Sequence, residues 1–145
     1  MTELHCYEEL DKYFQGKVLL VCGGSIKFLR INEYFENKKN VVEFHDFISN
    51  PLYESVVKGV DLFRKEKCTA IIAVGGGSAI DVAKCIKLYS NMDDSINYLT
   101  QEIIPNDIPL IAVPTTAGTG SEATRYAVIY YNGEKQSIAD VSCIP

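Results

Sequence analysis

Three apolar segments, each followed at once by a turn rich in glycine and hydroxyl side chains, constrain this sequence most. The apolar segments have the length of strands and cover residues 17–22, 69–74 and 110–113. The turns that follow them are Gly23-Gly24-Ser25, Gly75-Gly76-Gly77-Ser78 and residues 114–122. Short runs that are apolar on both faces are typical of strands in a parallel sheet, which is covered on both sides. Each segment therefore predicts a buried strand that ends in a polar turn.

Segments with the apolar spacing of helices alternate with these strands. Helices are predicted over residues 7–14, 25–36, 50–63 and 78–89, and a further strand over 41–45. Asn50 is expected to cap the third helix, with Pro51 in its first turn. Residues 90–107 read as a long polar loop, and residues 127–139 as a β-hairpin around Asn132-Gly133. Because strands alternate with helices, the sequence predicts an α/β fold with a largely parallel sheet, helices on both of its faces, and the hairpin.

The position of the three turns predicts a ligand site. Sheets of this kind bind ligands outside the carboxyl ends of their strands, so we expect the turns to converge on one edge. At residues 75–78, glycines leave backbone N–H groups open to a phosphate, and the helix start adds its positive dipole end. The same turn is also explained as a tight connection in which Ser78 and Asp81 form a capping box, and the two interpretations are compatible. The segment is neither a P-loop nor a Gly-x-Gly-x-x-Gly fingerprint.

The other two turns are less specific. Residues 114–122 supply hydroxyls and backbone N–H groups that suit ribose, pyrophosphate or a carboxamide, although such a run is also typical of a simple loop. The turn at Gly23-Gly24-Ser25 lacks the carboxylate that binds the adenosine ribose in NAD-selective sites. Ser25 and Lys27 could instead donate to a 2′-phosphate, or Lys27 could simply be solvated.

Composition and isolated side chains exclude several functions. The net charge of −5 and the pI of about 5.0 argue against a nucleic-acid partner, which needs clustered basic side chains. No stretch has the length of a membrane span, and the start lacks a secretory signal. The five cysteines are scattered without a Cys-x-x-Cys pair, which predicts unreactive thiols in a reducing cytoplasm. His5 and His45 stand alone, so we expect no catalytic and no metal-binding residue in this chain.

Two of the loops resemble the signatures of the iron-containing (group III) alcohol dehydrogenases. These are GGGSAIDVAK at residues 75–84 and PTTAGTGSE at residues 114–122. The first signature is shared with glycerol dehydrogenases and dehydroquinate synthases, and the second is more specific. Together with Asn50-Pro51 and Lys135, they extend the likeness from about Lys17 to Pro145. The segment 121–130 is also similar to phosphonoacetaldehyde reductases within the family.

The resemblance implies that residues 1–145 are a Rossmann-like N-terminal NAD(P)-binding domain. In complete members an all-helical domain follows and carries the metal ligands, an Asp and three His, which would lie after Pro145. Iron or another divalent metal is therefore expected only in a full-length protein, and the fragment alone is expected to be inactive. The implied activity is hydride transfer between a nicotinamide and a small alcohol or aldehyde, in a homodimer. The alternatives are a relative of dehydroquinate synthase or glycerol dehydrogenase, and a free-standing nucleotide-binding module without catalysis.

The resemblance also implies roles for individual residues. Gly76, Gly77 and Ser78 would bind the cofactor pyrophosphate, and Asp81 would lie near the nicotinamide. The nucleotide would be lined by Thr115, Thr116, Thr119 and Thr124. Lys135 would reach the ribose side, and Asn50 would contact the adenosine region. The turn Gly23, Gly24 and Ser25 would face the adenosine ribose. Because it lacks the Asp of NAD-using members, it is similar to the NADP-using ones, and we expect NADP(H) rather than NAD(H).

Overall fold

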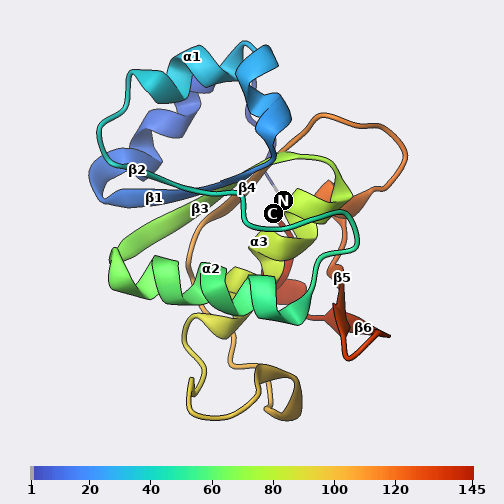
Figure 1. Ribbon diagram of the computed structural model, residues 1–145. Helices are drawn as coiled ribbons and strands as arrows, with labels where there is room; N and C mark the ends of the chain where they lie inside the picture. The colour runs from blue at the N-terminus through green and yellow to red at the C-terminus, as the bar shows by residue number, and fades with distance from the viewer. Residues whose placement is uncertain (1) are drawn as a thin grey trace.

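A parallel sheet covered on both faces forms the centre of the computed structural model, which describes residues 2–145 (Figure 1). Its four strands are β1 (Lys17–Cys22), β2 (Val41–Phe44), β3 (Cys68–Gly75) and β4 (Leu110–Pro114), in the spatial order β2-β1-β3-β4. The helices are α1 (Ile31–Glu36), α2 (Tyr53–Lys65) and α3 (Gly77–Tyr89). A separate antiparallel hairpin consists of β5 (Tyr126–Tyr131) and β6 (Glu134–Ala139). The α/β fold and the hairpin predicted from the sequence are confirmed.

Short 3₁₀ helices complete the chain between these elements. They are η1 (Tyr7–Gln15), η2 (Gly24–Phe28), η3 (Tyr98–Thr100), η4 (Ser121–Ala123) and η5 (Val141–Cys143). The predicted helix over residues 7–14 is therefore present as a 3₁₀ helix. Among residues 2–145, no helix combines the length and the apolar character that crossing a membrane requires.

The strand register brings the three polar turns to one edge. Cys22 of β1 lies opposite Val74 of β3, and Val74 lies opposite Val113 of β4. Because all three strands are parallel, the turns that follow them leave the sheet side by side. The expected convergence is confirmed.

Alternate strand residues build two cores. Leu19, Val21, Ile71 and Ala73 pack with α2, α3 and the hairpin on one face. Val18, Leu20, Ala70 and Ile72 pack with η1, η2 and α1 on the other. Figure 1 shows α1 on one side of the sheet, and α2 and α3 on the opposite side. This arrangement explains why the strands are apolar on both faces.

The helix predicted over residues 25–36 is instead broken in two. Leu29, between η2 and α1, has the extended dihedrals φ −102° and ψ 147°. Ile26 and Ile31 are both buried in the same core, but a separation of five residues does not place two side chains on one face of a single helix. The break lets both side chains reach the core, and it leaves Phe28 almost fully exposed.

The predicted cap of α2 is wrong. The helix begins at Tyr53 and its N-cap residue is Leu52. Asn50 adopts the left-handed conformation with φ 56°, which asparagine tolerates better than most residues. The Pro51 carbonyl then accepts a hydrogen bond of 2.9 Å from the Tyr130 N–H of β5. Leu52, which forms a bridge with Tyr130, is therefore extended and the helix starts after it.

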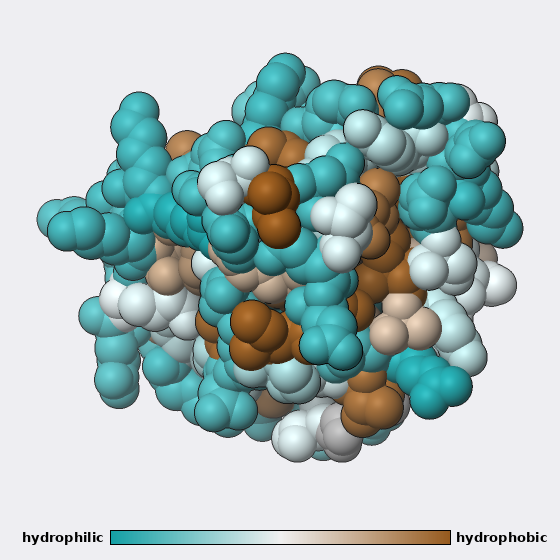
Figure 2. All heavy atoms as spheres, turned by 90° about the horizontal axis from the view of Figure 1, so that it is seen from below, coloured by the Kyte–Doolittle hydropathy of each residue, from teal (hydrophilic) through white to brown (hydrophobic). Residues whose placement is uncertain are grey.

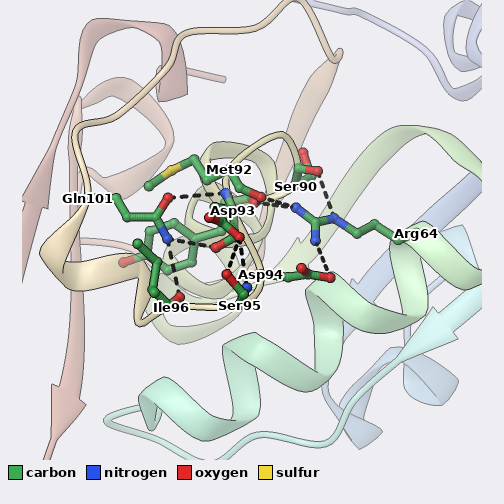
Figure 3. Close-up of polar contacts among 9 residues, drawn as sticks. Arg64, Ser90, Met92, Asp93, Asp94, Ser95, Ile96 and Gln101 are labelled. Atoms are coloured by element: carbon green, nitrogen blue, oxygen red, sulfur yellow. Dashed lines mark hydrogen bonds and ion pairs between the residues drawn. The ribbon is translucent and has the colours of Figure 1, made fainter.

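Arg64 of α2 binds the end of α3 and the long segment that follows it (Figure 3). Its guanidinium donates to the carbonyls of Tyr89, Ser90 and Met92 at 3.1, 2.9 and 2.6 Å, and it lies 3.2 Å from the Asp94 carboxylate. The last carbonyls of a helix have no partner inside it, so a cation there is favourable. The predicted loop is confirmed, and its fixed path depends on side chains.

The surface below α2 and this segment is mixed. Figure 2 shows hydrophobic atoms at several places between hydrophilic side chains on the face seen from below. Among the exposed large apolar side chains of the chain are Leu52, Ile96 and Ile104. Scattered exposed apolar residues of this kind are normal for a folded domain.

We expect one fast-reacting thiol per folded chain. Cys6 is exposed, whereas Cys22, Cys68, Cys85 and Cys143 are buried. Burial raises the pKa of Cys22 and that of Cys68 to about 11, so neither is an available thiolate at neutral pH. Thiol titration with a chromogenic disulfide at pH 7.5 should label one group quickly and the others only after unfolding. The variant Cys6→Ser should show no fast labelling, and any fast-reacting thiol in it would contradict the burial described here.

Replacing Arg64 with methionine should destabilise the chain far more than neutralising its carboxylate partner. Methionine keeps the apolar stem but leaves three carbonyls without their donor, and we expect a loss of about 2 kcal/mol. The Asp94 side chain is 68% exposed, so Asp94→Asn should change the unfolding free energy by less than about 0.5 kcal/mol. Urea unfolding measures both. Equal losses would mean that the ion pair, and not the carbonyl contacts, holds the segment.

Candidate functional site

The turn between β3 and α3 presents free backbone donors. Gly75 ends the strand with φ 153°, and Gly76 is the N-cap residue of α3. The first hydrogen bond of the helix runs from the Ile80 N–H to the Gly76 carbonyl, at 3.2 Å. The N–H groups of Gly77, Ser78 and Ala79 precede that bond, and in a helix such groups have no internal acceptor. The dipole of a 13-residue helix lies behind them, and such a helix start is electrostatically favourable for an anion.

The loop after β4 lies directly against this turn. The Thr115 N–H donates to the Gly75 carbonyl at 2.9 Å. A Cβ atom at Gly76 would lie 2.9 Å from the Thr116 hydroxyl oxygen, and one at Gly77 would lie 3.3 Å from the Thr119 methyl carbon. The two threonine side chains therefore occupy the space that side chains on the turn would need. The glycines permit this close approach of the two signatures.

A polar hollow of about 360 Å³ opens beside the turn. It is lined by Gly77, Ser78, Asp81, Thr119, Ser121, Thr124, Tyr126 and Val128. Five predicted cofactor residues thus meet in one place, whereas Gly76, Thr115 and Thr116 lie next to it in the turn and loop. A larger hollow of about 580 Å³ lies between β4 and the N-terminal residues. It contains none of the predicted residues, so the smaller hollow is the candidate site.

The predicted capping box is wrong. Ser78 lies inside α3, and no side chain caps the start of this helix within residues 2–145. The Asp81 carboxylate accepts hydrogen bonds from the Ser121 hydroxyl at 2.6 Å and from the Val128 N–H at 3.2 Å. Its two oxygens therefore bind the loop and the hairpin. As expected from its charge, it orients backbone and hydroxyl donors.

Sequence reasoning missed Lys84 and Ser121. The Lys84 side chain is fully buried, and its ammonium donates to the carbonyls of Thr124 and Tyr126 at 2.8 and 2.9 Å. Burial lowers the pKa of Lys84, and Asp81 opposes that shift. A signal was available, because Lys84 stands in an apolar stretch of the helix, where a solvated lysine would be out of place.

The remaining predicted residues lie outside the hollow. Gly23, Gly24 and Ser25 follow β1 at the same sheet edge, with Ser25 and Lys27 exposed. Asn50 forms the turn before α2, and Lys135 is exposed on β6 opposite Tyr130. Their contacts with a cofactor stay predictions.

The described residues do not supply a metal centre. Among residues 2–145, no group of three or more His, Cys, Asp or Glu side chains lies close enough to hold a metal ion.

The family model described as "Iron-containing alcohol dehydrogenase" matches residues 2–145. The chain belongs to the iron-containing alcohol dehydrogenase family. The choline dehydrogenase of Bacillus subtilis (strain 168) is 43% identical over 135 residues, which cover 86% of this chain and 34% of that protein. The 1,3-propanediol dehydrogenase of Citrobacter freundii is 39% identical over 105 residues, which cover 71% of this chain and 27% of that protein.

A solved structure of a reductase has the same fold. The sulfoacetaldehyde reductase of Bifidobacterium kashiwanohense in complex with NAD⁺ matches with a TM-score of 0.82 at 27% identity, over 95% of this chain and 39% of that chain. The chain thus spans between about a quarter and two fifths of these relatives. The resemblance inferred from the two signatures is confirmed.

Substituting Gly75 should cost more stability than substituting Gly23. At φ 153° any side chain is strained, and a Cβ there would lie 2.9 Å from the Ala79 Cβ on the rigid first turn of α3. We expect Gly75→Ala to lower the unfolding free energy by about 1–3 kcal/mol. Gly23 has φ −88° and no neighbour within 4 Å of its added Cβ, so Gly23→Ala should be neutral. Comparable losses in thermal unfolding would refute the strained turn.

Proposed function

We propose that this chain is the nicotinamide-dinucleotide-binding part of an alcohol dehydrogenase that transfers hydride between the nicotinamide and a small alcohol or aldehyde. One observation carries the proposal. The free N–H groups at the start of α3 face a hydroxyl-lined hollow. The glycine turn contacts the loop after β4 where Gly76 and Gly77 leave room for Thr116 and Thr119.

The site suits a dinucleotide diphosphate. Gly76, Gly77 and Ser78 would hold its two phosphates by backbone donors, which need no basic side chain. The hydroxyls of Thr115, Thr116, Thr119 and Thr124 would face the nucleotide. Asn50 and Lys135 are proposed for the adenosine and the ribose. When bound, the cofactor supplies the hydride acceptor or donor, and we assign no catalytic acid or base to these residues.

The relatives favour an oxidoreductase over the other candidates. The Bifidobacterium reductase is solved with NAD⁺, and a relative in Bacillus methanolicus is an NAD-dependent methanol dehydrogenase, 40% identical over 88 residues. The family match over residues 2–145 favours a dehydrogenase over a dehydroquinate synthase. A free-standing binding module would bind cofactor as well, so only turnover by the full-length protein separates it from the dehydrogenase.

We further propose that the cofactor is NADP(H). The turn Gly23-Gly24-Ser25 carries no carboxylate, and the exposed Lys27 is close by in sequence. A cation near the adenosine ribose attracts a 2′-phosphate, whereas a carboxylate there repels it. The absence of any atom within 4 Å of an added Gly23 Cβ leaves room for a larger side chain, which makes this position suitable for a test.

Calorimetric titration of the folded 145-residue chain should detect binding of NADPH that is weak, because the open hollow leaves much of the ligand in water. Gly23→Asp should shift the NADPH/NADH affinity ratio at least about tenfold toward NADH, a difference of about 1.4 kcal/mol. Gly23→Ala is the matched control and should leave the ratio unchanged. An unchanged ratio in Gly23→Asp removes the preference for NADP(H). A folded chain that binds neither cofactor overturns the proposed function.

Three properties of the complete protein are proposed on narrower grounds. The likeness of residues 121–130 to phosphonoacetaldehyde reductases supports a small acidic aldehyde as substrate, which product analysis with the full-length protein would test. Family resemblance supports a homodimer, testable by light scattering. The five free cysteines support a reducing compartment such as the cytoplasm, which fractionation would test.

A further inference from the structure

The buried ammonium of Lys84 connects α3 to the segment that forms one wall of the hollow. Lys84 extends from the second turn of α3, and its Nζ donates to the Thr124 and Tyr126 carbonyls at 2.8 and 2.9 Å. It also lies 3.3 Å from the Ser121 hydroxyl and 3.3 Å from the Thr124 hydroxyl. All of these acceptors belong to the segment that leads from the loop after β4 into β5. One ammonium therefore binds four acceptors of the wall.

Asp81 completes this arrangement one turn earlier on the same helix. The Ser121 hydroxyl donates to the Asp81 carboxylate at 2.6 Å and accepts from Lys84. The second oxygen of Asp81 accepts the Val128 N–H at 3.2 Å. The carboxylate therefore binds both ends of residues 121–128, at Ser121 and Val128. The ammonium binds Thr124 and Tyr126 between them and also contacts Ser121.

The geometry matters for the site because the loop that leads into this segment is exposed and has a permissive backbone. Thr115 to Thr119 are exposed, and Gly118 and Gly120 have positive φ values of 97° and 66°, which give the loop a permissive backbone. In contrast, Ser121 is buried and Lys84 is fully buried. A buried charge that loses its acceptors is strongly unfavourable, so Lys84 favours the one path of the chain that supplies them.

We propose that Lys84 is a positioning residue, which sets the distance between the Thr119–Thr124 wall and the glycine turn that the cofactor occupies. The proposal rests on the proposed function for the cofactor itself, but the fixing of the wall can be measured without any ligand. Lys84 touches no part of the hollow directly and acts through Ser121 and Thr124.

Lys87 provides a matched control on the same helix. It is also buried, at 4% exposure, and burial also lowers its pKa. Its ammonium donates to the carbonyls of Asn106 and Ile108 at 3.0 and 2.7 Å, and to the Asn106 side-chain oxygen at 3.0 Å. It thus fixes the segment that enters β4 from the other end of the strand, and it does not line the hollow.

The first measurement is hydrogen exchange of the 145-residue chain followed by peptide mass spectrometry. Lys84→Met should increase exchange at least tenfold in peptides that cover residues 119–128 and leave the exchange of residues 100–109 unchanged. Lys87→Met should give the reverse pattern. Uniform changes in both variants would show that the two lysines contribute only to global stability, and would overturn the positioning role. If Lys84→Met does not fold, Lys84→Gln replaces it, because its amide can still donate to one carbonyl.

The second measurement is cofactor affinity at a temperature where both variants are folded. Lys84→Met should weaken NADPH binding at least tenfold, whereas Lys87→Met should stay within twofold of the parent chain. If the parent chain binds and Lys84→Met binds equally well, the positioning role is wrong although the proposed function stands. If the parent chain binds no cofactor, the proposed function fails, and the exchange pattern still decides whether Lys84 fixes the wall.

Discussion

Parallel pairing of three apolar strands is the constraint on which the rest of this structure depends. Because β1, β3 and β4 run in one direction with their ends in line, every polar turn that follows a strand must leave at one edge. Because both faces of the strands are apolar, helical layers must cover both. The glycine turn and the threonine loop lie side by side for this reason, and their side chains then decide how closely they approach.

In the irregular segments, cationic side chains supply the hydrogen-bond donors that backbone N–H groups supply in helices and strands. Arg64 binds the carbonyls at the end of α3, Lys87 those before β4, and Lys84 those at the start of β5. Buried carbonyls need partners, and in each case a long donor from a helix provides them. The two irregular segments, residues 90–109 and 115–125, can therefore have defined paths although each forms few backbone–backbone hydrogen bonds.

The sequence predicted most of this fold, since strands of unbroken apolar residues and an Asn-Gly hairpin leave few alternatives. It failed where long-range partners decide the local structure. Asn50 has the ordinary properties of a helix cap, but the pairing of Pro51 with Tyr130 cannot be seen from either segment alone. Asp81 has the spacing of a capping box, but its partners are 40 and 47 residues away. Lys84 shows the same limit, because a lysine in an apolar stretch signals burial without telling what it binds.

The distribution of charge explains how an acidic chain can offer the proposed anion site with a carboxylate in its lining. Asp81 would repel a phosphate if its oxygens faced the hollow without partners. Instead, one oxygen accepts a hydrogen bond from the Ser121 hydroxyl and the other from the Val128 N–H. The ammonium of Lys84 lies 3.3 Å from the same hydroxyl. The negative charge of Asp81 and the positive charge of Lys84 therefore offset one another beside the wall. The positive potential at the glycine turn then comes from backbone N–H groups and the dipole of α3, which no titration removes.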